Sequence, residues 1–149
     1  MIWVLDASVA IRWFLEEEAD ERADLVLERI VQHPGQFAVP ELFAFETFAV
    51  LQRLHADPLR AFQHGILPLL QAGLFRQPMT RELAFDADRF VQLGLTGYDA
   101  CYAALAESLE GVWLTFDEKA HRRIQDLDLS CLLSIRLPTG WHPPGDGQL

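Results

Sequence analysis

Apolar and polar residues follow one another along this chain in short blocks that switch between strand and helix periodicity. Compact, β-prone apolar runs predict buried strands. These runs lie at 2–5, 37–39, 112–114 and 131–133, with 74–75 as either a minor strand or a turn. Longer blocks with helical spacing separate them, at 7–15, 19–32, 41–56, 59–72, 80–93, 96–110 and 118–125. Because strands and helices alternate, we predict an α/β fold with a parallel sheet and helices on both faces.

The stretch 95–117 holds one complete helix–strand unit. Its helix opens near Asp99 and ends at Gly111, and a short apolar strand follows. One side of the helix is an apolar stripe formed by Tyr98, Cys101, Tyr102, Leu105 and Leu109. Thr115 and Asp117 stand at the end of the strand, where open parallel sheets bind ligands. The unit therefore carries one carboxylate at the start of a helix and another beyond the end of a strand.

The helix predicted at 41–56 is apolar around more than one face. Such a helix is buried on more than one side, and in a monomer it would leave an exposed apolar patch. We therefore expect a homodimer whose interface includes one or more of these side chains: Phe43, Phe45, Phe48 and Leu51. Glu46 lies in the middle of this helix, where a carboxylate is costly unless it is paired, hydrogen-bonded or bound to a metal.

The composition indicates one globular domain. The chain has 149 residues, half of them apolar. We assign 1–137 to the domain and 138–149, which is rich in Pro and Gly, to a loose tail. No apolar run approaches the roughly 18 residues that span a bilayer, and the N-terminus lacks the basic region of a signal peptide. Cys101 and Cys131 lie in apolar segments, which predicts reduced core thiols in a cytoplasmic protein.

The net charge of −10 argues against nucleic-acid binding by simple attraction, which needs clustered Lys and Arg. It does not exclude a nucleic-acid enzyme, because acids that hold divalent cations also make a sequence acidic.

Four carboxylates occupy positions that suggest chemistry, and each also has a purely structural explanation. Asp6 and Asp117 each stand between a strand and a helix, so either could be only a helix N-cap. Asp99 follows Thr96 by three residues, as in a capping box. Glu46 has no capping position, and its alternative is a solvated strip of its helix.

Taken together, the four carboxylates predict a cation site. Three aspartates at strand–helix junctions of a parallel sheet point into one crevice, and Glu46 adds a fourth like charge. Such a cluster raises its own pKa values unless cations neutralise it. A ligand set made only of oxygens suits Mg²⁺ or Mn²⁺ better than zinc. Two hydroxyls, Ser8 and Thr115, lie two residues from Asp6 and Asp117 and could hold a ligating carboxylate or a bound water.

Other motifs are weak. The five histidines are scattered without metal-ligand spacing, and the chain has no Walker A, G-x-G-x-x-G or G-x-S-x-G motif. The basic residues Lys119, Arg122 and Arg123 follow Asp117 closely. They either receive substrate phosphates or form a solvated face, and the solvated face is the simpler interpretation.

Four sequence blocks stand in a recognisable order: VLDASVAIRWFLEEE, PELFAFETFAVL, LTGYDACYAALAES and LTFDEKAHRRI. Together, from Ile2 to about Leu133, they resemble the PIN domain family, in particular VapC-type toxins. The resemblance implies a three-layer α/β/α sandwich with a central parallel sheet. It maps the family's acidic metal site and its neighbouring hydroxyls onto Asp6, Glu46, Asp99, Asp117, Ser8 and Thr115.

The resemblance also implies a function: hydrolysis of RNA phosphodiester bonds with Mg²⁺ or Mn²⁺, by the toxin of a toxin–antitoxin pair with a small antitoxin partner. Asp6 and Asp99 would be direct ligands, and Glu46 and Asp117 would bind a second ion or orient the water. One departure is Ala49, where the family often has Asn, and this change could weaken the site. Two alternatives remain: a catalytically idle PIN-like binding module, and a small-molecule phosphohydrolase that uses the same metal site.

Overall fold

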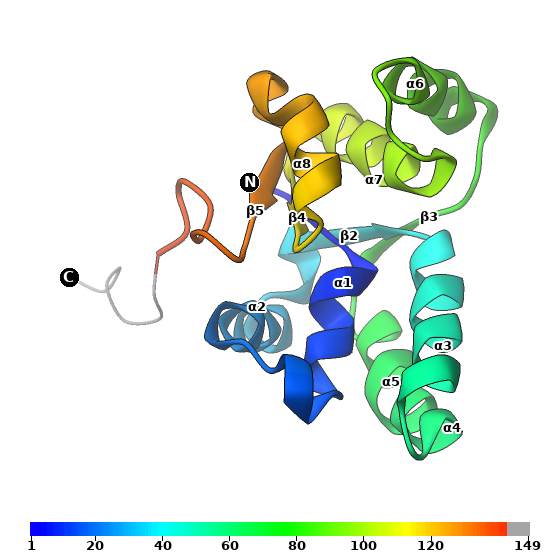
Figure 1. Ribbon diagram of the computed structural model, residues 1–149, viewed down its shortest axis with the longest axis vertical. Helices are drawn as coiled ribbons and strands as arrows, with labels where there is room; N and C mark the ends of the chain where they lie inside the picture. The colour runs from blue at the N-terminus through cyan, green and yellow to red at the C-terminus, as the bar shows by residue number, and fades with distance from the viewer. Residues whose placement is uncertain (143–149) are drawn as a thin grey trace.

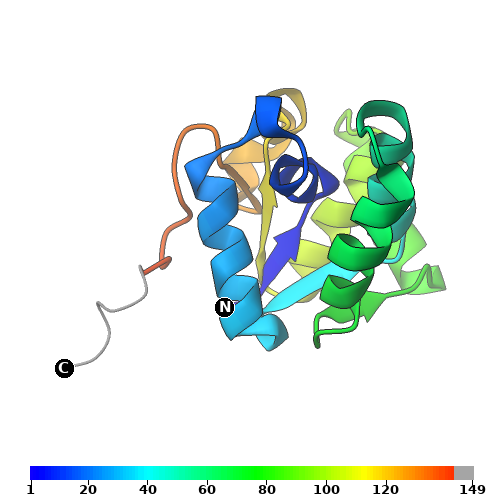
Figure 2. The same cartoon turned by 90° about the horizontal axis from the view of Figure 1, so that it is seen from below.

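The computed structural model describes residues 1–142, and at its centre is a five-stranded parallel sheet (Figures 1 and 2). The strands are β1 Trp3–Leu5, β2 Phe37–Pro40, β3 Phe75–Gln77, β4 Val112–Thr115 and β5 Ser130–Leu132. They lie in the order β3-β2-β1-β4-β5, and each pairs in parallel with its neighbours. The run at 74–75, left open as strand or turn, therefore belongs to an edge strand.

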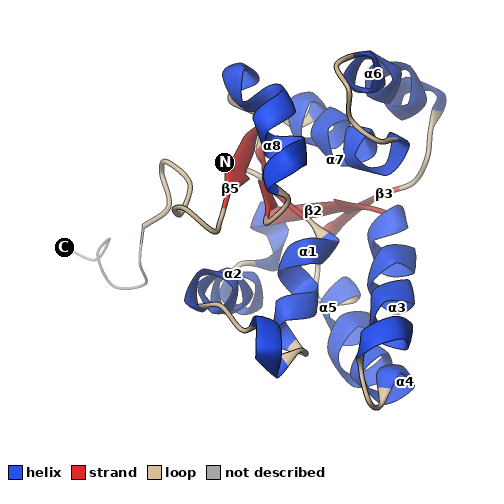
Figure 3. Cartoon of the chain, viewed as in Figure 1, coloured by secondary structure: helices blue, strands red, loops and turns tan. Residues whose placement is uncertain are grey.

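Helices cover both faces of the sheet. They are α1 Ala7–Ala10, α2 Glu21–Gln32, α3 Leu42–Leu54, α4 Pro58–Ala61, α5 Leu67–Leu70, α6 Arg81–Gln92, α7 Gly97–Ser108 and α8 Glu118–Ile124. Figure 3 shows α6, α7 and α8 on one side of the sheet and α1 to α5 on the other. This arrangement confirms the predicted three-layer α/β/α sandwich.

The order of the strands places a switch point at β1. From β1 the chain moves outward to β2 and β3, and then crosses back to β4 and β5 on the other side of β1. Parallel crossovers are right-handed, so the two directions of travel put their helices on opposite faces. The carboxyl ends of β1 and β4 are thus left with a crevice between them, which is where open α/β sheets bind ligands.

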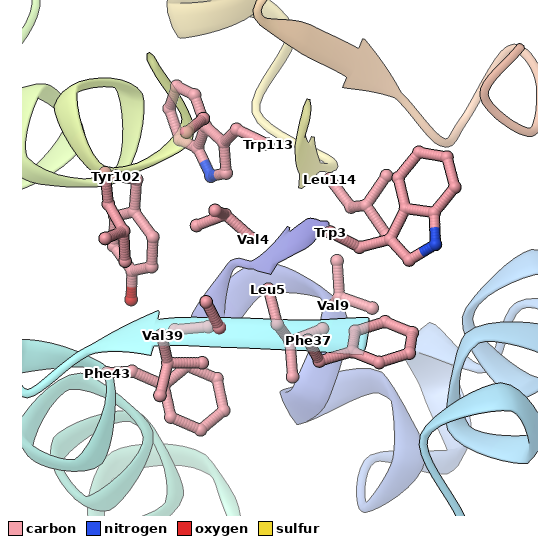
Figure 4. Close-up of a cluster of buried hydrophobic side chains, with 14 of the residues drawn as sticks. Trp3, Val4, Leu5, Val9, Phe37, Val39, Phe43, Tyr102, Trp113 and Leu114 are labelled. Atoms are coloured by element: carbon pink, nitrogen blue, oxygen red, sulfur yellow. The ribbon is translucent and has the colours of Figure 1, made fainter. Parts of the chain in front are cut away.

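Large apolar side chains fill the space between the sheet and the helices, as Figure 4 shows around β1, β2 and β4. The ring of Tyr102 on α7 stacks on Trp113 of β4, with centroids 5.7 Å apart and planes 9° from parallel. The alanines of α7 are all buried, as expected for a helix lying close against a sheet. Tyr98, which the sequence assigned to the same stripe, is 66% exposed, because it lies in the first turn of α7, beyond the core.

The apolar helix α3 divides its aromatic residues between the core and the surface. Phe43 and Leu51 are fully buried within this chain, so of the four residues predicted for a dimer interface these two are not available to a partner. Phe45 and Phe48 are 75% and 42% exposed. The apolar residues around α3 therefore serve the chain's own core on one face and leave a second face uncovered.

The segment predicted as one weakened helix at 59–72 is α4, a π-helical turn at Phe62–Ile66, and α5. Glycine at position 65, within this π-helical turn, has a packing reason: a Cβ atom there would lie 2.2 Å from Cε1 of Phe14. The aromatic ring thus occupies the space that a side chain would need.

The C-terminal segment, expected to be loose from residue 138, is packed at Trp141. The indole of Trp141 lies 5.4 Å from the ring of Trp3 and 6.4 Å from that of Phe37, and the Arg29 guanidinium covers it at 4.2 Å. Burial of a large aromatic surface outweighs the local Pro and Gly content. The rest of the predicted tail, 143–149, lies outside the described residues. Within residues 1–142 no helix has both the length and the apolar character to cross a membrane.

Candidate active site

Asp6 is the first residue after β1, at the switch point of the sheet. Its backbone N–H donates to the carbonyl oxygen of Leu114 on β4 at 3.2 Å, so the strand ladder continues up to this residue. Its backbone carbonyl starts α1, but its side chain makes no capping hydrogen bond. Asp6 is only 5% exposed. The explanation of Asp6 as a side-chain N-cap is therefore wrong.

Two hydroxyls hold the Asp6 carboxylate. Ser8 Oγ donates to Asp6 Oδ2 at 2.5 Å, and Thr115 Oγ1 donates to the same oxygen at 2.8 Å. Each hydroxyl also accepts a backbone N–H, from Phe116 at 3.0 Å for Ser8 and from Asp117 at 3.0 Å for Thr115. Because the N–H groups occupy the acceptor positions, the hydroxyl protons are directed toward Asp6. Ser8 and Thr115 thus have the supporting position predicted for them.

The charge of Asp6 is costly in this setting. The pKa of Asp6 is raised to about 6: burial raises it most, the hydrogen bonds from Ser8 and Thr115 lower it, and the negative charges of Asp99 and Asp117 add to the rise. Burial outweighs the two hydroxyls, since the final value stays above the ordinary 3.8.

Asp117 follows β4 and is the N-cap of α8. Its Oδ1 accepts the N–H of Ala120 at 3.0 Å, which confirms the capping interpretation for this residue. A cap occupies one oxygen of the carboxylate, so the two roles are compatible.

Asp99 lies in the first turn of α7, where its backbone N–H donates to Thr96 Oγ1 at 3.2 Å. The reciprocal bond of a full capping box, from the Asp99 carboxylate to the N–H of Thr96, is not formed among the described residues. Burial raises the pKa of Asp99, the charge of Asp117 raises it further, and the Thr96 hydroxyl opposes both.

Glu46 points one carboxylate oxygen into the protein. Its Oε1 is buried and has no hydrogen-bond partner within residues 1–142, which contradicts the alternative of a solvated strip. The pKa of Glu46 is raised to about 7: burial raises it most, the nearby Tyr102 hydroxyl lowers it, and the charges of Asp6 and Asp99 add to the rise. The Tyr102 hydroxyl acts on Glu46 by proximity, because both oxygens lack a partner with hydrogen-bond geometry. Ala49, one turn further along α3, is exposed.

These mutual effects join the four carboxylates into one electrostatic unit, which we call the acidic cluster: Asp6, Glu46, Asp99 and Asp117. Asp6 responds to Asp99 and Asp117, Glu46 responds to Asp6 and Asp99, and Asp99 responds to Asp117. Each member therefore feels, or acts on, at least one other. The four acids are far apart in sequence: Asp6 and Asp117 lie just beyond β1 and β4, Glu46 is on α3 and Asp99 is on α7.

The acidic cluster has the chemistry of a hard-cation site. Its donors are all carboxylate and hydroxyl oxygens, and Glu46 Oε1 is an orphaned buried acceptor, so the residues present fit Mg²⁺ or Mn²⁺. Within residues 1–142, no three His, Cys, Asp or Glu side chains already surround a common point at metal-binding range. The carboxylates would therefore have to reorient to enclose an ion.

Two further residues at the site were not connected with it from the sequence. Tyr102 was assigned only to an apolar stripe, yet its hydroxyl faces Glu46. The Arg12 guanidinium lies 3.9 Å from the centroid of Phe116, the residue between Thr115 and Asp117. No sequence pattern links Arg12 to Phe116, because the contact depends on the pairing of β1 with β4.

A cavity of about 410 Å³ lies away from these residues, between the end of α3 and the segment that precedes α2. Its lining includes Phe14, Leu15 and Leu54, and none of the acidic cluster. Size alone therefore does not identify the site.

The fold and the buried acids together define an α/β sandwich protein with an acidic site at the switch point of its sheet. The sequence profile of the PIN domain matches residues 3–127. The chain belongs to the PIN domain family. No curated protein matches it.

Solved structures share this fold at low sequence identity. PAE2754 from Pyrobaculum aerophilum is 21% identical with a TM-score of 0.66, over 91% of this chain and 86% of that one. The FitAcB structure from Neisseria gonorrhoeae is 15% identical with a TM-score of 0.64, over 83% of this chain and 94% of that one. VapC20 from Mycobacterium tuberculosis is 15% identical with a TM-score of 0.61, over 80% of this chain and 93% of that one.

The raised pKa values predict a stability that depends on pH. The folded protein holds the protons of Asp6 and Glu46 more tightly than the unfolded chain, so their ionisation destabilises the fold. In chelator this cost is complete above about pH 7, shrinks as pH falls through the folded pKa values, and vanishes below the ordinary values of 3.8 and 4.5. Through these two groups, the melting temperature of the metal-free protein should rise as the pH falls from about 8 to about 5.

Glu46→Gln removes one of these charges. At about pH 8 in chelator it should melt at least about 2 °C higher than wild type, the shift that roughly 0.5–1 kcal/mol produces in a chain of this size. Glu28→Gln, on the exposed side of α2, is the control and should melt like wild type. Thermal melts showing Glu46→Gln equal to or below wild type would contradict this assignment.

Proposed function

We propose that this protein is a metal-dependent endoribonuclease that hydrolyses RNA phosphodiester bonds, and that it is the toxin of a toxin–antitoxin pair. One observation carries the proposal: a buried carboxylate at the switch point, Asp6, is held by two hydroxyls and coupled to three further acids. Membership of the PIN domain family supports it. So does the likeness of fold to VapC20, which is described as a Sarcin-Ricin loop cleaving toxin.

The residues of the acidic cluster have different roles in the proposed mechanism. Asp6 and Asp99 would hold Mg²⁺ or Mn²⁺ directly, and Glu46 and Asp117 would hold a second ion or orient the attacking water. When bound, the cation lowers the pKa of a water molecule and stabilises charge on the phosphate. Ser8 and Thr115 keep the Asp6 carboxylate in one orientation through the hydrogen bonds at its Oδ2.

The proposed partner is a small antitoxin protein, and the proposed location is the cytoplasm, where RNA is the substrate. Structures with the same fold include a toxin–antitoxin complex from Klebsiella pneumoniae and VapBC2 from Rickettsia felis bound to a DNA fragment from its promoter. An antitoxin would keep the nuclease inactive until it is removed.

The decisive substitution is Asp6→Asn, which keeps the shape of the side chain and removes its charge. In Mg²⁺ or Mn²⁺ the wild-type protein should cleave RNA, and Asp6→Asn should lose more than about a hundredfold in rate, because metal-dependent stabilisation contributes several kcal/mol. Thr115→Val should lose about tenfold to a hundredfold, as expected when a residue that orients a ligand is removed.

Asp88→Asn, on the exposed surface of α6, is the control and should cleave like wild type. Intact RNA with wild-type protein in both metals would overturn the proposal. Turnover of a small phosphate ester in the same assay would then favour a phosphohydrolase, and no turnover of either would favour an idle binding module.

We also propose that the protein is a homodimer through the uncovered face of α3. Phe45 and Phe48 are exposed there, and the edge strand β3 and helix α6 add Phe75 and Phe85, which are 50% and 73% exposed. Figure 1 shows α3, β3 and α6 along the same side of the molecule. An uncovered apolar surface of this kind favours association.

Light scattering at tens of micromolar should give the mass of a dimer for wild type and of a monomer for Phe45→Asp. Val31→Asp is the matched control, because Val31 on α2 is 72% exposed and belongs to a different part of the surface. A monomeric wild type, or a Phe45→Asp variant that stays dimeric, would contradict the assignment of this face.

A further inference from the structure

A small cavity adjoins the acidic cluster on the side of α8. Its volume is about 140 Å³, more than a single water molecule needs. The lining includes Gly94, Thr96, Asp99, Asp117, Lys119 and Arg123. Two members of the acidic cluster thus share a cavity with two cations.

Neither cation is held in an ion pair within the described residues. Arg122, which lies between them in sequence, pairs with Glu118. Lys119 and Arg123 are one helical turn apart and both line the cavity, whereas Arg122 is not part of its lining. The basic run seen in the sequence is therefore split into a paired residue and two residues that line the cavity.

The backbone at Gly94 makes room for Arg123. A Cβ atom on Gly94 would lie 2.6 Å from Nη1 and 2.9 Å from Cδ of Arg123. Gly94 has a φ of +103°, which the turn after α6 requires and which itself favours glycine. The absent side chain lets the Arg123 guanidinium lie directly against this turn, at the edge of the cavity.

An acidic nuclease needs such cations next to its site. The chain carries a net charge of −10, and the acidic cluster repels the phosphates on either side of the one being cut. Two other arginines are held in ion pairs, Arg76 with Glu41 and Arg89 with Glu107. Lys119 and Arg123 combine an unpaired charge with a position on a cavity shared with the cluster.

We propose that Lys119 and Arg123 bind a backbone phosphate of the RNA strand, adjacent to the scissile phosphate at the acidic cluster. The assignment rests on the proposed ribonuclease function and adds a specific substrate contact to it. The two side chains suit a phosphate group, since Arg offers a planar fork of donors and Lys a point charge. Their role is to bind the strand; neither takes part in the chemical step.

Steady-state RNA cleavage in Mg²⁺ or Mn²⁺ tests this proposal with a matched pair of variants. The double variant Lys119→Ala with Arg123→Ala should raise KM by on the order of tenfold and leave kcat within about twofold, because only binding is lost. The plot of log(kcat/KM) against log salt should become shallower by roughly 0.7 for each phosphate contact removed from a single strand. Arg122→Ala, on the same helix, should match wild type in KM and in salt dependence.

Chemical acetylation gives a second readout, because Lys119 is the only lysine in the chain. Acetylating the wild-type protein should raise its KM severalfold. A Lys119→Arg variant should keep a wild-type KM and be insensitive to the same treatment, which also controls for reaction at the N-terminus.

The outcomes separate this proposal from the function on which it rests. If wild type cleaves RNA and the double variant behaves like Arg122→Ala, the phosphate site is overturned and the nuclease stands. If the double variant loses kcat at unchanged KM, the phosphate site is likewise overturned. If wild type does not cleave RNA in either metal, the nuclease proposal falls first and the phosphate site with it.

Discussion

The hydrogen bonds from Ser8 and Thr115 to a single oxygen of Asp6 are the interaction on which this site depends. They join the end of β1 to the end of β4 at the point where the order of strands reverses. Burial makes the carboxylate costly, and two hydroxyls offset only part of that cost, since the pKa of Asp6 remains raised at about 6. A charge kept in such a place is a functional candidate, because a neutral residue would be more stable there.

The rest of the fold serves to bring other acids to this point. Pairing of β1 with β2 and β4 fixes where α3 and α8 begin, and α7 lies against the sheet because its alanines are small. The negative charges then repel one another: the charge of Asp99 raises the pKa of Glu46, and the charge of Asp117 raises the pKa of Asp99. A bound divalent cation would relieve this repulsion, so we expect the cation to stabilise the folded protein.

Much of this could be predicted from the sequence, for reasons that particular residues illustrate. Alternation of strands and helices indicated the layers, and Asp6 and Asp117 were recognisable because they lie just beyond the ends of strands. The capping role of Asp117 was foreseen, while Asp6 turned out not to be a side-chain cap. Which faces of α3 are covered could not be predicted: Phe43 is buried and Phe45 exposed, although both are phenylalanines in one apolar helix. Local pattern failed at Trp141, whose burial depends on the distant Trp3. It left two interpretations open for Lys119, because no sequence pattern shows that this residue shares a cavity with Asp99.

In the proposed function, the acidic cluster takes up a divalent cation in exchange for protons. Calorimetric titration of the wild-type protein with Mn²⁺ at about pH 6.5, in two buffers of different ionisation enthalpy, measures both binding and protons released. Because the pKa values of Asp6 and Glu46 are raised to about 6 and about 7, both groups are partly protonated at that pH. The account predicts saturable binding with release of a substantial fraction of one proton or more per protein. No saturable binding, or binding with heats that are the same in both buffers, would contradict it.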